Sequence, residues 1–182
     1  MGKLFVISGS SGVGKGTIIK EFLKRNGDFK LSVSCTTRKP REGEIHGTNY
    51  FFLSKEEFKA SIEKGEFLEW AEFSENMYGT QRPYVDKKLA QGKNLILEID
   101  TQGALKVKKI MPEATLIFIL PPSFEELETR LRGRHTETEE AIQKRLKSTK
   151  MEMENSKFFD FQIINDDIEN AVRQLEKIMI SK

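Results

Sequence analysis

The 182-residue chain is predicted to be an α/β protein with a doubly wound parallel sheet, and two observations support this class. Residues 94–99 (NLILEI) and 115–120 (TLIFIL) are near-continuous apolar runs, which are typical of strands buried on both faces of a parallel sheet. Segments with helical spacing alternate with these and other strand-like segments, and such alternation favours a doubly wound sheet.

The first half of the chain is predicted to start with a strand at residues 4–8, followed by a glycine-rich loop and a helix at residues 17–24. Ser54-Lys-Glu-Glu57 is a capping box that predicts the start of a helix. Pro83 suits the first turn of another helix, which is expected to reach Ala90 and to end before Gly92. The remaining segments of this half that are expected to form strands are 31–34, 50–53 and 67–73 (FLEWAEF).

The second half is predicted to contain a helix at residues 103–110, between its two apolar strands. Further capping boxes begin at Ser123 and Thr136, and they predict helices extending to about residues 131 and 155. The last strand is expected at residues 161–164. Asp167 is expected to cap a final helix whose apolar face consists of Ile168, Val172, Leu175, Ile178 and Met179.

The length and this rhythm together predict one domain with an insertion. Residues 33–83 interrupt the alternation with short strands and one helix, so they are expected to form an inserted lobe. The core would then comprise residues 1–32, 84–121 and 157–182, and the polar helices at residues 122–156 would form a separate helical lid.

Composition excludes several kinds of protein. The formal net charge of +2 is too balanced for a protein that holds duplex nucleic acid. Cys35 is the only cysteine, so neither an intrachain disulfide nor a thiolate metal cage is expected. The N-terminal apolar run is too short for a secretory signal or a membrane span, and Val6 stands where a myristoylation motif requires Ser or Thr. We therefore expect a cytoplasmic protein that needs no membrane and no obligatory protein partner.

The glycine-rich loop has the pattern G-x-x-x-x-G-K after a strand and before a helix. Its backbone N–H groups, the helix N-terminus and Lys15 can together bind a polyphosphate, whereas the alternative is a flexible turn with a surface lysine. Gly16 replaces the usual Ser or Thr, so Mg²⁺ is expected to be held through water and phosphates. The residues expected to bind the phosphates of a nucleotide here are Gly9, Ser10, Ser11, Gly12, Val13, Gly14, Lys15, Gly16 and Thr17.

A second basic segment, residues 32–44 (SVSCTTRKPREGE), suggests another anion site. Arg38 and Arg41 bracket Pro40, whose fixed φ restricts the backbone, and two guanidinium groups so placed could clamp one phosphate. Tyr50 and Tyr78 could add phenol donors. Spacing alone leaves open the alternative of a solvated basic loop.

The same segment belongs to a series of motifs that resembles the guanylate kinase family over essentially the whole chain. These motifs are SVSCTTRKPREGE, GTNYFF, EFLEWAEF, MYGT, LEIDTQG, FILPPS, RLRGRHTETEE and IINDD, in this order. His135 stands where the family commonly has Gly, and Ser10 where it commonly has Pro, so lid flexibility is the property most open to change.

The resemblance implies Mg²⁺-dependent transfer of the ATP γ-phosphoryl group to GMP, and also to dGMP, within a phosphate-loop fold with a GMP-binding lobe and a lid. It implies that Arg38, Arg41, Tyr50 and Tyr78 bind the GMP phosphate, that Ser34, Glu69 and Thr80 read guanine, and that Glu98 and Asp100 lie near GMP and the metal. Asp100 would reach the metal through water. Asn165 would lie beside adenine, and the catalytic cations would be Lys15, Arg38, Arg130, Arg134 and Arg145.

The chemistry of guanine agrees with this assignment. Its adjacent N1–H and N2–H groups suit a carboxylate such as Glu69, whereas adenine would leave that carboxylate unpaired. Two alternatives remain open: a guanylate-kinase-like scaffold module that binds phosphopeptides without catalysis, and a kinase for AMP or UMP. The intact loop with Lys15 disfavours the first, and Glu69 and Thr80 disfavour the second.

Overall fold

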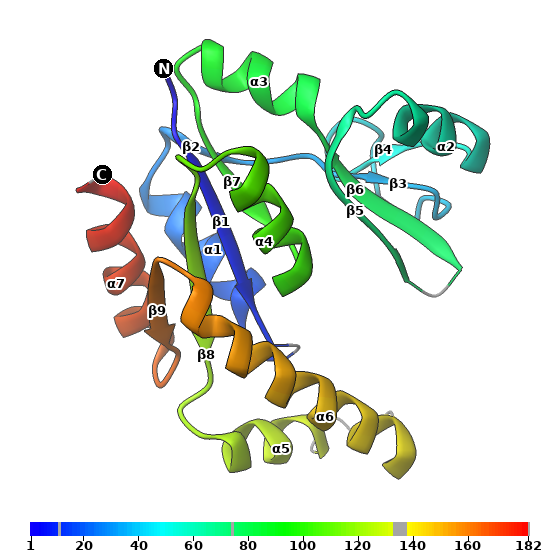
Figure 1. Ribbon diagram of the computed structural model, residues 1–182. Helices are drawn as coiled ribbons and strands as arrows, with labels where there is room; N and C mark the ends of the chain where they lie inside the picture. The colour runs from blue at the N-terminus through cyan, green and yellow to red at the C-terminus, as the bar shows by residue number, and fades with distance from the viewer. Residues whose placement is uncertain (11, 74, 133–137, 182) are drawn as a thin grey trace. The chain divides into compact units, whose positions relative to one another are not determined.

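The computed structural model describes residues 1–10, 12–73, 75–132 and 138–181 (Figure 1). The chain divides into two compact units. The first unit consists of Met1–Leu4, Asp28–Leu97 and Gln102–Ala114, and the second of Phe5–Gly27, Glu98–Thr101 and Thr115–Lys182.

A five-stranded sheet has the strand order β2-β7-β1-β8-β9. Its strands are β1 (Leu4–Gly9), β2 (Phe29–Leu31), β7 (Asn94–Glu98), β8 (Thr115–Leu120) and β9 (Phe161–Ile164). The pairs β1–β8, β8–β9 and β2–β7 are parallel. All six residues of β1 are buried, and so are the four central residues of β8, as expected for strands covered on both faces. The predicted α/β class with a parallel sheet is confirmed.

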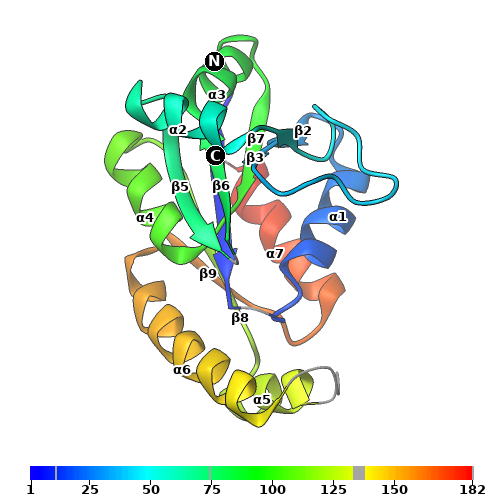
Figure 2. The same ribbon diagram turned by 90° about the vertical axis from the view of Figure 1, so that its right-hand side faces the viewer.

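In the second unit, helices α1 (Lys15–Arg25) and α7 (Ile168–Ile180) lie side by side (Figures 1 and 2). Both contribute fully buried apolar side chains, among them Phe22 from α1 and Leu175 from α7. Asp167 caps α7 by accepting a hydrogen bond from the Asn170 backbone N–H at 3.0 Å, as predicted. Ile168 was expected on the apolar face of this helix, but its position in the first turn leaves it 42% exposed.

The second unit also contains α5 (Phe124–Arg132), α6 (Glu139–Asn155) and a short 3₁₀ helix (Ser156–Phe158). The Ser123 hydroxyl accepts a hydrogen bond from the Glu126 backbone N–H at 3.0 Å, which confirms its predicted capping role. The prediction that a helix starts after Thr136 was wrong. The described helix begins at Glu139 because the Thr138 hydroxyl accepts from the Ala141 N–H and forms the N-cap. Thr136 itself lies outside the described residues.

In the first unit, four short strands form a second sheet in the order β4-β3-β6-β5. They are β3 (Cys35–Thr36), β4 (Phe51–Phe52), β5 (Phe67–Phe73) and β6 (Asn76–Gln81). Helix α2 (Lys55–Glu63) lies against this sheet (Figure 1), and its predicted capping box between Ser54 and Glu57 is present. Phe58 of α2 packs with Cys35 and Met77 and stacks on Phe67, with ring centroids 4.4 Å apart. All four strands fall within residues 33–83, whose identity as a distinct lobe stays a prediction.

Two differences from the sequence-based expectation concern this unit. The predicted strand at residues 31–34 was wrong, because β2 ends at Leu31 after its pairing with Ile96, and β3 begins only at Cys35. Strand β6 was not predicted at all, because Gly79 interrupts a polar segment. A Cβ at Gly79 would lie 2.8 Å from the Glu69 carbonyl oxygen, so this strand requires glycine where it approaches β5.

Helices α3 (Arg82–Ala90) and α4 (Thr101–Ile110) also belong to the first unit, except that Thr101 is assigned to the second. Pro83 lies in the first turn of α3, as predicted. In the described part of the chain, no helix is long and apolar enough to span a membrane.

The ion pair between Arg25 and Glu169 gives a test of how α1 and α7 contribute to acid stability. Both nitrogens of the Arg25 fork donate to the Glu169 carboxylate, and this pairing lowers the pKa of Glu169 to about 2 from an ordinary value of 4.5. A lowered folded-state pKa stabilises the protein above pH 4.5, and that contribution is lost as pH falls towards 2. Glu169→Gln should therefore reduce the difference between the urea unfolding midpoints at pH 6 and pH 3.

The matched control is Glu113→Gln, which removes an exposed carboxylate that has no hydrogen bond or ion pair with the described residues. It should leave the pH dependence of the urea midpoint as it is in the wild type. An unchanged pH dependence in Glu169→Gln would contradict the predicted role of the pair.

Candidate active site

The loop between β1 and α1 has the backbone geometry of an anion-binding turn. Gly12 and Gly14 adopt φ values of 83° and 96°, which residues with a side chain rarely adopt. Gly14 is the N-cap of α1, and the first turn of α1 contains no acidic residue. The N–H groups that begin a helix have no partner within it, so this N-terminus can bind a negatively charged group.

Lys15 is anchored to the base of this loop. Its Nζ donates a hydrogen bond to the Gly9 carbonyl oxygen at 2.6 Å. Burial lowers the pKa of Lys15, and the negative charges of Glu98, Glu152 and Asp100 partly offset that effect. The lysine is therefore a partly desolvated cation surrounded by carboxylates, which a bound phosphate could replace as its partner.

Asn165 supports the loop from the end of β9. Its side chain is buried, and Nδ2 donates to the Val13 carbonyl oxygen at 2.7 Å. A Cβ added to Gly14 would lie 2.7 Å from the same Nδ2 atom, so the close approach also requires glycine. This contact shows that Asn165 fixes the loop, while its expected position beside adenine stays a prediction.

Glu98 is the last residue of β7 and Asp100 lies two positions beyond it, and both influence Lys15 electrostatically. A Cβ at Gly16 would lie 3.8 Å from Glu98 Oε1, so a carboxylate oxygen is close to the position that lacks the usual hydroxyl. The described residues contain no group of three or more His, Cys, Asp or Glu side chains that could hold a metal ion by themselves. The arrangement therefore fits Mg²⁺ that is held largely by nucleotide phosphates and water, with carboxylates nearby.

Glu152 of α6 is a residue near the loop that sequence reasoning missed. Burial is the main reason that the pKa of Glu152 is raised. The positive charge of Lys15 partly offsets this increase, and the negative charge of Asp100 adds to it. Its position among other charged residues of a polar helix gave no sequence signal. Only the packing of α6 brings this carboxylate into the surroundings of Lys15.

The basic segment of the first unit forms a compact cation site around Arg38. Two N–H···O bonds of 2.9 Å join the Arg38 guanidinium to the Glu44 carboxylate, and the guanidinium also lies over the Tyr50 ring at 5.5 Å. The Tyr50 and Tyr78 rings meet edge to face with centroids 6.3 Å apart. Arg41 is exposed at the same turn, where its backbone N–H donates to Glu44 at 2.7 Å.

Glu69 and Thr80 form a buried polar pair on neighbouring strands. They are cross-strand partners in the β5–β6 ladder, and the Thr80 hydroxyl donates to Glu69 Oε1 at 2.7 Å. Glu69 is 7% exposed and Thr80 is 0% exposed. Ser34 lies half-buried in the same unit, and its carbonyl oxygen accepts from the Phe51 N–H at 2.8 Å. A buried carboxylate so placed is suited to accept hydrogen bonds from a ligand.

The predicted lid cations are described only in part. Arg134 lies outside the described residues, as do Ser11 of the loop and His135. Arg130 belongs to α5 and Arg145 to α6, and their catalytic roles stay predictions.

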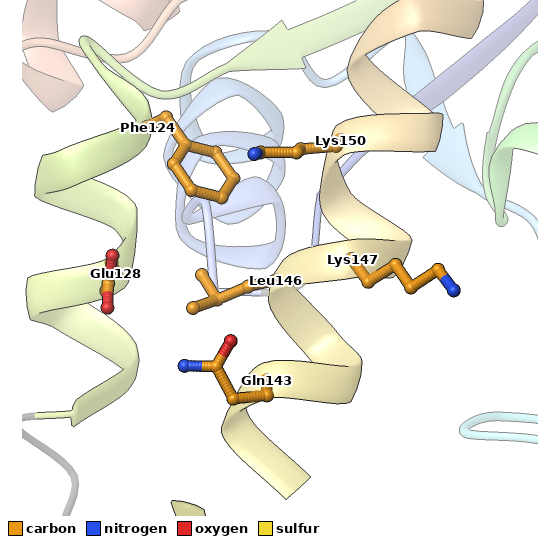
Figure 3. Close-up of a pocket in the computed structure, with 6 residues that line it drawn as sticks. All are labelled: Phe124, Glu128, Gln143, Leu146, Lys147 and Lys150. Atoms are coloured by element: carbon orange, nitrogen blue, oxygen red, sulfur yellow. The ribbon is translucent and has the colours of Figure 1, made fainter. Parts of the chain in front are cut away.

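A pocket of about 360 Å³ lies between α5 and α6 (Figure 3). Lys150 points toward the Phe124 ring, with Nζ 5.1 Å from its centroid, while Lys147 extends away from α5. The pocket is lined by Phe124, Glu128, Gln143, Leu146, Lys147 and Lys150. None of these six residues was predicted as a site residue.

The structure thus groups the predicted residues within each unit. The loop residues described, Lys15, Asn165, Glu98 and Asp100 belong to the second unit. The Arg38 cluster and the Glu69–Thr80 pair belong to the first. Glu44 is the main residue of the cation site that sequence reasoning missed, although its place three residues after Arg41 could have indicated a turn contact.

A parallel α/β sheet with a glycine loop, an anchored lysine and a helix N-terminus defines a phosphate-loop nucleotide-binding protein. The guanylate kinase family model matches residues 1–182. The chain belongs to the guanylate kinase family.

The individual relatives agree over nearly the whole chain. The guanylate kinase of Clostridioides difficile is 50% identical over 181 residues, covering 100% of this chain and 88% of the relative. That of Caldanaerobacter subterraneus is 51% identical with the same coverage. The crystal structure of guanylate kinase from Anaplasma phagocytophilum matches with a TM-score of 0.76 and 32% identity, covering 99% of this chain and 85% of that one.

The loop geometry can be tested with two glycines of the same loop. Gly14→Ala should destabilise the protein by about 1–3 kcal/mol, because alanine would be strained at φ 96° and its Cβ would collide with Asn165. Gly16→Ala is the control, since its Cβ has room at 3.8 Å from the nearest atom. The measurement is chemical unfolding, and equal stability of the two variants would show that the Gly14 geometry is not required.

Proposed function

We propose that this chain transfers the γ-phosphoryl group of ATP to GMP, and also to dGMP, giving ADP and GDP. The observation that carries the proposal is the buried Glu69–Thr80 pair, because its hydrogen-bonding groups are complementary to those of guanine and the chain belongs to the guanylate kinase family. The two anion-binding arrangements, one around Arg38 and one around the β1–α1 loop, match an acceptor and a donor that both carry phosphate.

Guanine recognition would depend on the polarity of Glu69. Its carboxylate can accept from both N1–H and N2–H of guanine, while Thr80 keeps the carboxylate oriented through their 2.7 Å hydrogen bond. Adenine lacks this pair of donors and would leave a 7% exposed carboxylate without them, which is costly. Ser34, in the same unit, is the proposed partner of the guanine O6.

The acceptor phosphate would be bound by Arg38, Arg41, Tyr50 and Tyr78. Arg38 is already oriented by Glu44 and the Tyr50 ring, whereas the exposed Arg41 side chain can move onto the ligand. The two cations would offset the repulsion between two polyanionic substrates.

On the donor side, the N–H groups of the loop and the α1 N-terminus would hold the ATP phosphates, with Lys15 at their outer end. Arg130, Arg134 and Arg145 are proposed to close over the same phosphates, and Asn165 to lie beside adenine. The barrier would fall because these cations neutralise charge on the transferring group while the acceptor is held in line.

Magnesium is the proposed cofactor. Bound to the ATP phosphates, it would neutralise charge on them, and Asp100 would contact it through water, with Glu98 nearby. Because a GMP phosphate oxygen is already ionised near neutral pH, the acceptor needs no general base. No covalent intermediate is required.

Two alternatives fit the residues less well. A scaffold module without catalysis would not need Lys15 to be desolvated and bonded to the base of an intact phosphate loop. A kinase for AMP or UMP would not match the buried Glu69 carboxylate. We further propose a cytoplasmic location, where ATP and GMP are available, with no requirement for nucleic acid, a membrane or an obligatory protein partner.

The acceptor preference gives the direct test. With ATP and Mg²⁺, we expect ADP release with GMP and dGMP, and much less with AMP, UMP or no acceptor, because only guanine supplies the donors that Glu69 accepts. A coupled ADP-release assay measures this preference. Faster turnover with AMP would contradict the base assignment, and no turnover with any acceptor would favour a binding module.

Glu69 can be tested separately from catalysis in general. Glu69→Gln replaces an acceptor oxygen by a donor, so we expect GMP affinity to fall by about tenfold or more, with ATP affinity nearly unchanged. Glu72→Gln is the control, since Glu72 lies on the same strand but is exposed. Calorimetric titration with each nucleotide measures both affinities, and equal losses for ATP and GMP would be evidence against a separate guanine site.

A further inference from the structure

Glu44 is the centre of the hydrogen bonds in the turn at residues 38–44, where the GMP phosphate is proposed to bind. Its Oε2 accepts from Arg38 Nη1 at 2.9 Å and from the Arg41 backbone N–H at 2.7 Å, and its Oε1 accepts from Arg38 Nη2 at 2.9 Å. The Glu44 backbone N–H in turn donates to the Arg41 carbonyl oxygen at 3.1 Å. The Glu44 side chain therefore contacts both arginines of the turn: it binds the guanidinium of Arg38 and the backbone N–H of Arg41.

The pairing leaves one edge of the Arg38 guanidinium available. A guanidinium has five N–H hydrogens, and Glu44 takes two of them. A third goes from Nη1 to the Lys39 carbonyl oxygen at 2.8 Å. The Nε–H and the second Nη2 hydrogen make none of these three bonds and lie along one edge of the plane, and Tyr78 is a further hydrogen-bonding neighbour of this guanidinium. Two parallel N–H groups on one edge match two oxygens of one phosphate.

The position of Arg38 is fixed by more than the ion pair. Its guanidinium carbon lies 5.5 Å from the Tyr50 ring centroid and 5.9 Å from that of Phe52. The side chains of Arg38 and Glu44 are only 16% and 19% exposed. Such partly buried, bidentate pairs are more rigid than exposed ion pairs. The Arg38 backbone N–H also donates to the Thr36 hydroxyl at 3.1 Å.

The Arg41 side chain, unlike that of Arg38, is not held in place. Its side chain is exposed and makes no hydrogen bond, ion pair or ring contact with the residues that the structure describes. Only its backbone is held, through Glu44. The turn thus combines one fixed guanidinium with one that can reorient.

We propose that Glu44 is a positioning residue for the acceptor phosphate: its carboxylate fixes the Arg38 guanidinium so that the Nε–Nη2 edge faces the phosphate, and it fixes the backbone from which Arg41 reaches the same group. This proposal rests on the proposed function. Arg38 and Arg41 then have separate roles, since the first provides a preformed bidentate contact and the second a mobile charge. The Arg38 pairing, followed by the Arg41 N–H, lowers the pKa of Glu44 to about 2, so Glu44 stays ionised at assay pH.

The central experiment is Glu44→Gln, which keeps the shape of the side chain but turns one acceptor oxygen into a donor facing the arginine. GMP affinity should fall by about ten- to a hundredfold, because a hydrogen-bonded charge pair is lost. Guanosine, which lacks the phosphate, should bind the variant as it binds the wild type. KM for ATP should stay within about twofold, so KM for GMP changes selectively.

The matched control is Glu42→Gln, which removes an exposed carboxylate from the same turn. GMP affinity should be unaffected by this change. Glu44→Asp is the second variant in case Glu44→Gln unfolds. It keeps the charge, but its shorter side chain cannot reach all three donors. GMP affinity should therefore fall by a smaller factor than in Glu44→Gln. Thermal melts establish that each variant is folded.

A double-mutant cycle identifies the residue through which Glu44 acts. In an Arg38→Met background, Glu44→Gln should change GMP affinity by less than about threefold, because only the route through the Arg41 backbone remains. In an Arg41→Met background it should keep most of its effect, because the route through the Arg38 guanidinium is intact. The full effect of Glu44→Gln in the Arg38→Met background would overturn the positioning role, and so would equal losses for GMP and guanosine. If the wild type phosphorylates GMP and Glu44→Gln binds it normally, the positioning role alone fails. If the wild type neither binds nor phosphorylates GMP, the proposed function fails as well.

Discussion

The turn from β1 into α1 is the structural constraint on which the proposed ATP site depends. Every residue of β1 is buried, so the strand cannot shift, and α1 must begin at Lys15 within a few residues of its end. Only left-handed backbone at Gly12 and Gly14 makes that connection, and Asn165 closes against Gly14 and Val13. The same geometry leaves the first N–H groups of the helix without a partner inside the helix and places Lys15 at the Gly9 carbonyl. Anion binding therefore follows from how the strand and helix are joined.

In both cation sites, carboxylates balance a partly buried positive charge. Lys15 is partly desolvated, and Glu98, Glu152 and Asp100 supply the opposing charge. Arg38 is balanced by Glu44 and by aromatic faces. Burial of a cation without such partners would be costly. The carboxylates around each site therefore stabilise its cation, even where they are not themselves proposed to contact a ligand.

The buried Glu69–Thr80 pair, the proposed site of guanine recognition, depends on strand pairing in the first unit. The β5–β6 register places Glu69 opposite Thr80, and the close approach of β6 at Gly79 allows the 2.7 Å hydrogen bond between their side chains. A shift of one residue would turn Glu69 to the other face of the sheet. The hydrophobic contacts of Phe58, Cys35 and Met77 hold this sheet against α2, so the polar pair depends on an apolar cluster behind it.

The α/β class, most helices with their caps, and the glycine-rich loop before α1 followed from the sequence alone, because apolar periodicity, capping boxes and glycine spacing are local signals. The sequence also pointed to Lys15, Arg38 and Arg41 as the cations of two predicted anion sites. Strand β6, the end of β2 at Leu31 and the start of α6 at Glu139 were decided by pairing and capping contacts that the local pattern did not contain. The partners of the cations were also left to the tertiary structure. Glu44 and Glu152 look like ordinary surface carboxylates in the sequence, and only packing and turn geometry bring them to Arg38 and Lys15, since charge interactions depend on distance in space rather than along the chain.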